Sequence, residues 1–228
     1  IINVENVSKK FGEKVILQDV SFGMEAGEMI GVIGINGTGK PTLLKIIAGQ
    51  EETDQGNVIR RNNLKVAVLP QVPEFPKGKT LLSCITDSIE DMADGWNMEA
   101  RAREMLTALE LPDVETAEHL SGGELKKLAL IQTLIQPSDI LILDEPTSGL
   151  DPLMQREFFD ILRARNRAGN TVCLSSHVLS EIQSDCSRAA VIREGGIIAC
   201  GSVETLAQTS ARRVTVHGRI CLDGLKGI

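Results

Sequence analysis

Hydrophobic and polar positions change their spacing along the chain, and these changes mark the elements that we expect. In the first 25 residues, short β-prone segments at 1–7, 14–17 and 20–24 are separated by Gly12 and Asp19, which predicts an antiparallel sheet. The apolar run at 29–33 enters a glycine-rich turn, and residues 42–48 carry leucine and isoleucine at helical spacing before Gly49. This region therefore predicts a strand, a loop and a helix.

The middle of the chain predicts a hairpin followed by a helical insertion. Residues 57–61 and 64–69 have the pattern of two strands joined at Asn62 and Asn63. From 80 to 111 the composition becomes helical, and Glu99 precedes Arg103 by one helical turn. Beyond it we expect helices at 121–136, 155–168 and 178–185, strands at 140–143 and 171–175, and a hairpin at 189–200. Strands that alternate with helices predict a parallel sheet covered on both faces, and hence an α/β fold.

Composition and charge narrow the possible functions. The 228 residues include 24 Lys and Arg against 31 Asp and Glu, a net charge of −7. This balance argues against a protein that covers nucleic acid with its whole surface. No apolar run approaches the ~18 residues that cross a bilayer. An odd number of cysteines without a C-x-x-C pair indicates a reducing compartment, and we interpret all five as buried packing residues: Cys84, Cys173, Cys186, Cys200 and Cys221.

The strongest candidate site is the segment Gly34–Lys40, which has the pattern G-x-x-x-x-G-K between the strand at 29–33 and the following helix. Glycines let successive backbone N–H groups point into one concavity, and the helix N-terminus adds partial positive charge. Lys40 would reach the outer phosphates of a bound nucleotide. The alternative is a glycine-rich turn without a ligand.

Position 41 departs from this pattern, because Pro41 stands where a phosphate loop continues with Ser or Thr. Proline has neither the hydroxyl that binds Mg²⁺ nor an N–H. Thr42 is rotated by ~100° around the helix and cannot simply replace it. We therefore expect a nucleotide still to bind, but less tightly, with weak Mg²⁺ dependence and slow turnover.

A second acidic motif follows the apolar run at 140–143. Asp144 and Glu145 would lie at the carboxyl edge of the sheet, beside the phosphate loop. Asp144 would hold Mg²⁺, and Glu145 would take a proton from the attacking water. Alternatively, these two residues with Pro146 only cap a strand in a turn.

Leu120–Glu124 reads Leu-Ser-Gly-Gly-Glu and places Ser121 23 residues before Asp144. Together with the phosphate loop, this spacing resembles the nucleotide-binding domain of ABC ATPases. The resemblance implies a P-loop NTPase with a mixed, mainly parallel sheet, an antiparallel N-terminal β-subdomain and an inserted helical subdomain at about 72–130. It also implies an ATP-binding domain at 1–208. The alternation of Val214 and Val216 predicts that 209–228 begins a truncated C-terminal element.

The resemblance also assigns roles to single residues. Phe11 matches the aromatic that stacks on adenine, Gln71 the glutamine that senses Mg²⁺ and the attacking water, and His177 the switch histidine. Ser121–Gly123 matches the family's signature sequence. Three of these residues have a plainer alternative: Phe11 as a core residue of an edge strand, His177 as a satisfied histidine at a strand end, and Ser121, with Glu124, as a capping box. The expected ATP-binding set is Phe11, Gly34, Asn36, Gly37, Thr38, Gly39, Lys40, Thr42, Ser121, Gly122, Gly123 and Asp151; the catalytic set is Glu145, His177 and Gln71; the metal set is Asp144 and Gln71.

Two branches of the family remain open. Residues 34–39 and 69–76 look like the ABC-F group, which acts on ribosomes, whereas 148–152 and 175–181 look like ATP-binding subunits of exporters. We favour the exporter, because one domain is present where ABC-F proteins need two and no basic arm faces RNA. This reading implies a homodimer or heterodimer closed by ATP, a permease partner docking near 72–94, and a cytoplasmic location at the inner face of the membrane. A third reading is a nucleotide-gated dimeriser that hardly hydrolyses ATP because of Pro41.

Overall fold

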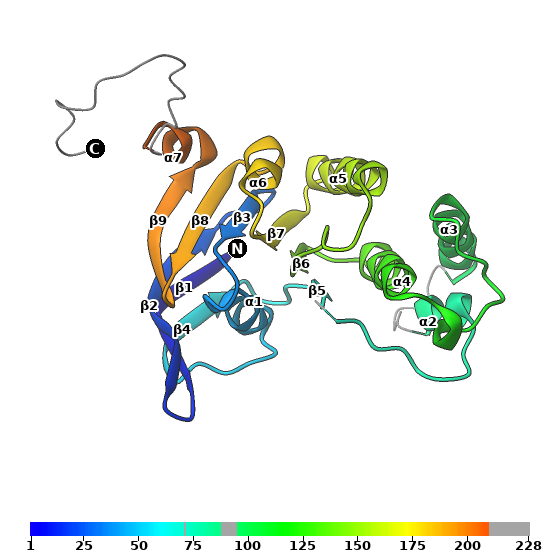
Figure 1. Cartoon of the computed structure of the whole chain (residues 1–228), viewed down its shortest axis with the longest axis horizontal. Coiled ribbons are helices and arrows are strands. Elements are labelled where there is room, and N and C mark those ends of the chain that lie inside the picture. Colours follow the sequence, from blue (N-terminus) through cyan, green and yellow to red (C-terminus); the bar gives the residue numbers. More distant parts are fainter. Residues whose placement is uncertain (71, 88–94, 210–228) are drawn as a thin grey trace, which may run out of the picture.

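The computed structural model describes residues 1–70, 72–87 and 95–209 and arranges their strands in two sheets (Figure 1). The strands are β1 Ile2–Phe11, β2 Lys14–Met24, β3 Met29–Ile33, β4 Gln55–Arg60, β5 Val66–Leu69, β6 Ile140–Leu143, β7 Thr171–Ser176, β8 Arg188–Arg193 and β9 Gly196–Ser202. The helices are α1 Lys40–Ala48, α2 Leu81–Thr86, α3 Gly95–Ala108, α4 Gly122–Ile135, α5 Pro152–Arg167, α6 Leu179–Asp185 and α7 Val203–Thr209, with a 3₁₀ turn at Ala117–His119. None of these helices is long and apolar enough to span a membrane.

The larger sheet has the strand order β5-β6-β7-β3-β8-β9, and the smaller, antiparallel sheet has the order β2-β1-β4. In the larger sheet β5, β6, β7, β3 and β8 run parallel, while β9 is antiparallel to β8 at the edge. The carboxyl ends of β3, β6 and β7 therefore meet at one edge, so the segments that follow them become neighbours. This confirms the predicted α/β fold with a mixed, mainly parallel sheet.

Alternate residues of the central strands pack into two separate apolar layers. Ile140 and Ile142 of β6 face α1 and the smaller sheet, whereas Leu141 and Leu143 face α5 and α6. Figure 1 shows α1 on one side of the larger sheet and α5 and α6 on the other. Because both faces are covered by apolar side chains, the ends of these strands are held in fixed positions.

Helices α2 and α3 form a third apolar cluster with one face of α4, at the end of the molecule remote from the smaller sheet (Figure 1). Leu81, Leu106 and Leu128 are fully or almost fully buried in it. The expected pair of Glu99 and Arg103 forms an ion pair at 2.7 Å on the surface of α3. The helical composition predicted for 80–111 is thus confirmed in the described residues, while its stretch 88–94 lies outside them.

The hairpin predicted at 57–69 is wrong. β4 pairs with β1 in the smaller sheet, whereas β5 pairs in parallel with β6 in the larger one. Between them Asn63 has a φ of 57°, and the Asp139 carboxylate accepts hydrogen bonds from the Arg61 guanidinium and the Lys65 amide, both at 2.9 Å. Parallel pairing with β6 buries Leu69 completely, which an isolated two-stranded hairpin cannot do.

Two further expectations need correction. The segments 14–17 and 20–24 belong to one strand, β2, in which Asp19 adopts a φ of 50° and accepts a hydrogen bond from the Asn6 side chain at 2.7 Å. Cys200 is exposed, because it lies on β9 at the edge of the sheet. Of the other cysteines, Cys84, Cys173 and Cys186 are buried as expected, and Cys221 lies outside the described residues.

Candidate functional site

The phosphate-loop motif lies between β3 and α1, as its sequence context predicts. Gly37 and Gly39 have φ values of 84° and 96°, in the left-handed region that favours glycine. At Gly39 a Cβ would also come within 2.8 Å of the Ile16 carbonyl oxygen. The glycine at this position therefore allows both the turn into α1 and the close approach of β2.

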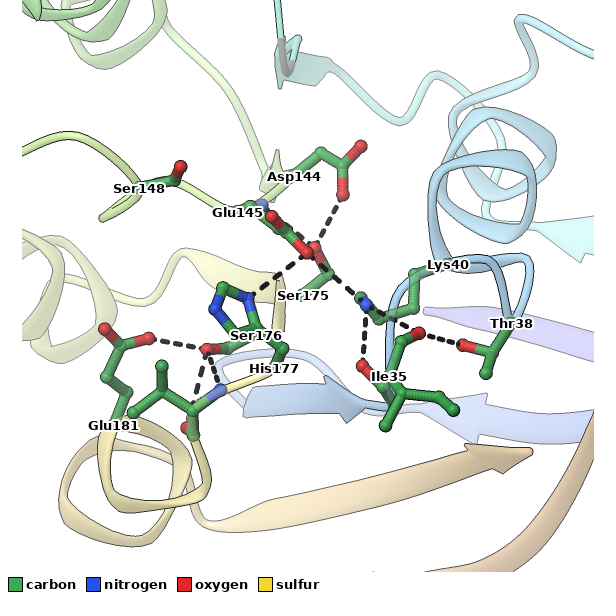
Figure 2. A network of polar contacts seen from close by, with 12 residues as sticks. Ile35, Thr38, Lys40, Asp144, Glu145, Ser148, Ser175, Ser176, His177 and Glu181 are labelled. Atoms are coloured by element: carbon green, nitrogen blue, oxygen red, sulfur yellow. Dashed lines mark hydrogen bonds and ion pairs between the residues drawn. The ribbon is translucent and has the colours of Figure 1, made fainter.

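Lys40 and Thr38 point back into this loop. The buried Lys40 ammonium donates to the carbonyls of Gly34 at 2.6 Å and Ile35 at 3.3 Å, and the Thr38 hydroxyl donates to the Ile35 carbonyl at 2.9 Å. Figure 2 shows both side chains directed toward Ile35. Phosphate oxygens entering the loop would compete with these carbonyls for the protons of Lys40.

The loop opens onto a hollow of about 640 Å³ that residues Gly34–Thr38 share with His177 and Glu194. Asn36 and Gly37 lie on its exposed side. Main-chain N–H groups, a helix N-terminus and one lysine are the groups that bind phosphate in proteins. The lining of the hollow also includes apolar side chains such as Val191 and Ile192 and the carboxylate of Glu194, so it is the loop at its edge, with Lys40, that suits a polyanionic ligand.

Pro41 occupies the first turn of α1, where its fixed φ is tolerated. It lines a second hollow, of about 450 Å³, together with Leu69, Gln132 and Asp144. The proline ring thus faces the space beside the Asp144 carboxylate. Thr42 is half-buried one position further along the helix. No side-chain oxygen is supplied from position 41 to this space.

Asp144 follows β6 and is largely buried. Its Oδ1 accepts a hydrogen bond from the Ser175 hydroxyl at 2.6 Å, and Ser175 Oγ accepts in turn from the Glu145 amide at 2.9 Å. Burial raises the pKa of Asp144; the Ser175 hydrogen bond opposes this shift, and the neighbouring Glu145 adds to it. A buried carboxylate with a raised pKa is stabilised by a cation, and Mg²⁺ binds one or two carboxylates together with substrate phosphates. Asp144 therefore fits a magnesium ligand.

Glu145 stands at the centre of the network in Figure 2. Its Oε1 lies 3.4 Å from Lys40 Nζ and 3.5 Å from His177 Nδ1. His177 is half-exposed at the end of β7, where Ser176 donates to Glu181 at 2.6 Å and accepts from the Val178 amide at 2.9 Å. The carboxyl ends of β3, β6 and β7 thus bring Lys40, Glu145 and His177 together, and Glu145 lies beside the phosphate loop as predicted for the end of a parallel sheet.

Other expected site residues lie outside this network. Phe11 is half-exposed at the end of β1, with the Lys9 ammonium 5.4 Å from its ring centroid, so it is not a core residue. Asp151 caps α5 by accepting hydrogen bonds from the amides of Leu153 at 3.0 Å and Met154 at 3.1 Å. Gln71 lies outside the described residues.

The turn Ser121–Gly123 begins α4 as a capping box. Glu124 Oε2 accepts from the Ser121 amide at 2.7 Å, and Ser121 Oγ accepts from the Glu124 amide at 3.4 Å. The Ser121 hydroxyl also donates to Glu124 Oε2 at 2.6 Å, and this hydrogen bond, together with the one from the Ser121 amide, lowers the pKa of Glu124. A Cβ built on Gly123 would lie 3.8 Å from the Gly149 carbonyl oxygen, so this turn lies next to the segment that leads to Asp151. The predicted capping box of Ser121 and Glu124 is thus formed, and it is compatible with a ligand at this helix N-terminus.

Sequence reasoning missed two residues that hold the acidic loop. Ser175 orients both acidic residues, and the buried Lys126 of α4 donates to the carbonyls of Glu145 at 2.7 Å and Ser148 at 2.8 Å. Burial lowers the pKa of Lys126, against the opposing effect of Glu145 and Asp144. The sequence could have predicted the burial of Lys126, because Lys126 has helical spacing with Ala129, Leu130 and Thr133, which are buried on the same face of α4.

Comparison with known proteins adds an independent result. The family model described as "ABC transporter" matches residues 17–148. The Nod factor export ATP-binding protein I of Burkholderia orbicola (strain AU 1054) is 31% identical over 225 residues, covering 91% of this chain and 73% of that protein.

Solved structures agree at the level of the fold. An ATP-binding subunit of an ABC transporter has a TM-score of 0.82 at 24% identity, covering 91% of this chain and 92% of that chain. A dimeric ATP-binding cassette in a post-hydrolysis state, bound to ADP and Pi, has a TM-score of 0.78 at 24% identity. The match covers 89% of this chain and 99% of that chain. Since the family model spans more than half of the sequence and the curated relative covers nearly all of it, the chain belongs to the ABC transporter family, as an ATP-binding subunit.

Proposed function

We propose that this chain binds and hydrolyses Mg-ATP and uses the cycle to drive an exporter. The observation that carries the proposal is the convergence of Lys40 and His177 on the Glu145 carboxylate, at 3.4 and 3.5 Å, beside a loop of main-chain amides. A lysine for phosphate, a carboxylate for proton transfer and a histidine at the same edge are suited to phosphoryl transfer to water. The exporter assignment is supported by the name of the Burkholderia relative.

The chemistry proposed for the site follows from these positions. Phosphate oxygens replace the carbonyls of Gly34 and Ile35 as partners of Lys40, which weakens the contact between Lys40 and Glu145. Glu145 then accepts a proton from water, a contribution of ~10²–10⁴ in rate. His177 donates to the transferred phosphate. Asp144 would hold Mg²⁺, which supplies charge neutralisation at the phosphates.

The remaining expected residues keep their proposed roles. Phe11 stacks on adenine through the exposed half of its ring surface. Gln71 senses the metal and the attacking water. Ser121–Gly123 and Asp151 serve a nucleotide bound to a second subunit, so that ATP closes a homodimer or heterodimer. The fold likeness to a dimeric ATP-binding cassette supports this arrangement.

Export requires a membrane-spanning permease, and we propose that it docks on residues 72–94. Val72, with 75% of its surface exposed, supplies apolar contact area there. The chain would then sit at the cytoplasmic face of the membrane through that partner. Co-expression with the permease should be needed for the chain to pellet with membranes. Sedimentation with ribosomes in the presence of ATP would favour the ABC-F role instead.

Pro41 supports a second candidate function, a dimeriser that binds ATP with little hydrolysis. The two candidates are separated by measuring ATP-induced dimerisation and steady-state phosphate release on the same preparation. We expect both ATP-induced dimerisation and slow phosphate release, and the release should fall by ~10²–10⁴ when Glu145 is replaced by Gln. Dimerisation without release would support the dimeriser, and a folded protein that ignores millimolar ATP would contradict both.

A further inference from the structure

A buried lysine holds the loop that carries Glu145. Lys126 lies on α4 with 8% of its surface exposed, and its ammonium donates to the Glu145 carbonyl at 2.7 Å and the Ser148 carbonyl at 2.8 Å. The two carbonyls belong to the turn after β6, in which the Ser148 amide also donates to the Glu145 carbonyl at 3.2 Å. One side chain from α4 thus closes both ends of this turn. Glu145 and Ser148 lie near each other in Figure 2.

The backbone of Glu145 needs such support. Its φ of 45° lies in the left-handed region, which a glutamate adopts only when its surroundings hold it there. Ser175 Oγ of β7 accepts from its amide at 2.9 Å, and Lys126 binds its carbonyl. The two peptide groups that flank the Glu145 Cα are therefore fixed from two different elements. The direction of the Glu145 side chain depends on both.

We propose that Lys126 is a positioning residue for hydrolysis, which acts by holding Glu145 against Lys40 and His177; this rests on the proposed ATPase function. Its ammonium contacts the Glu145 main chain, so it acts through that residue. The same side chain joins α4, which begins at the Ser121 turn, to the loop of the proton acceptor.

The test compares Lys126→Met with Lys127→Met on the same helix. Methionine keeps most of the Lys126 chain and removes the ammonium. Lys127 is the matched control, because its ammonium donates at 3.3 Å to the Leu109 carbonyl, away from the acidic loop. For Lys126→Met we expect kcat to fall at least about tenfold, since small displacements of a reacting group cost up to ~10²-fold. The Kd for ATP should change less than about twofold, because the phosphate loop is untouched.

A double-mutant cycle separates positioning from general destabilisation. In a Glu145→Gln background, Lys126→Met should lower single-turnover hydrolysis no further, because the residue through which Lys126 acts is already inactive. An additional tenfold loss in that background would overturn the proposal. Equal kcat in wild type, Lys126→Met and Lys127→Met would also overturn it. Lys126→Gln keeps a donor on a shorter chain and should recover part of the rate.

Hydrogen exchange of the nucleotide-free protein provides a readout independent of turnover. The amides of Ser148 and Leu150, which bond to carbonyls of the same turn, should exchange faster in Lys126→Met and not in Lys127→Met. Unchanged exchange would show that Lys126 does not hold the loop. If the wild type binds ATP but releases no phosphate, the proposed ATPase function fails, and the exchange result alone decides whether the loop is held by Lys126.

Discussion

The phosphate loop and the acidic loop meet in one site but are stabilised in different ways. In the phosphate loop, Lys40 and Thr38 bond to carbonyls six and three residues away in the sequence. In the acidic loop, the side chains that bond to the main chain of Glu145 are those of Lys126, 19 residues before it, and Ser175, 30 residues after it. One loop is a local structure, whereas the other is held by distant elements.

Under the proposed function, this difference in how the two loops are held separates nucleotide binding from catalysis. A loop shaped by glycine dihedrals and its own lysine can present amides to a phosphate wherever a strand leads into a helix. A carboxylate that must meet water at a chosen distance needs its backbone held from outside. We therefore expect changes in the phosphate loop to act mainly on affinity, and changes in the acidic loop to act mainly on turnover.

The largest effect is expected from Glu145→Gln in the acidic loop. Glutamine keeps the shape of the side chain but cannot accept the proton, so phosphate release should fall by ~10²–10⁴. Equilibrium binding of ATP should persist, as the phosphate loop is unchanged. Glu157→Gln on the exposed face of α5 is the control. If Glu145→Gln lowered the affinity for ATP as much as the rate of phosphate release, the assignment of affinity to one loop and turnover to the other would be wrong.

Lys40→Met should show the opposite pattern. Removing a hydrogen-bonded charge costs ~1.5–3 kcal/mol, so the Kd for ATP should rise by ~10–100-fold. Isothermal titration of the variant with ATP measures this directly. Lys45→Met, at an exposed position one turn and a half further along α1, should bind ATP as the wild type does. An unchanged Kd for Lys40→Met would place the nucleotide elsewhere.

Pro41→Ser should increase activity, because it returns a hydroxyl to the hollow that Asp144 lines. We expect steady-state phosphate release to rise about tenfold and to saturate at lower Mg²⁺, the gain of one hydrogen bond or metal contact at a charged site. Pro41→Ala is the informative control, since it removes the ring without adding an oxygen. If alanine gives the same rise, the absent hydroxyl is not the cause.

The smallest effect is expected from Asp144→Asn, on stability. Because burial raises the pKa of Asp144, its charge at pH 7 costs stability, and the neutral variant should melt at a higher temperature. A domain of this size shifts by about 2–4 °C per kcal/mol. The gain should shrink as pH falls through the folded-state pKa and vanish below the ordinary aspartate value of about 3.9. Melting curves of the nucleotide-free proteins across that range test the sign, and a gain that grows toward low pH would contradict it.

The chain's own pattern predicted the parts of the fold that are locally encoded. The strands at 29–33 and 140–143 have the predicted bounds, and Gly49 ends α1 in a left-handed conformation. The hairpin at 57–69 was wrong because each of its strands finds a longer-range partner that buries more apolar surface. Turn residues such as Asn63 indicate where the chain bends, but they do not indicate which sheet it joins.

The sequence by itself determined the α/β fold, the phosphate loop and the identity of the residues at the carboxyl ends of β3, β6 and β7. Only the tertiary structure decided that Ser175 orients both acids and that Lys126 reaches the Glu145 carbonyl. The physical reason is the distance along the sequence over which each interaction acts. Glycine dihedrals and helix starts depend on a few neighbouring residues, whereas the contacts of a buried lysine exist only after α4 has packed beside the sheet.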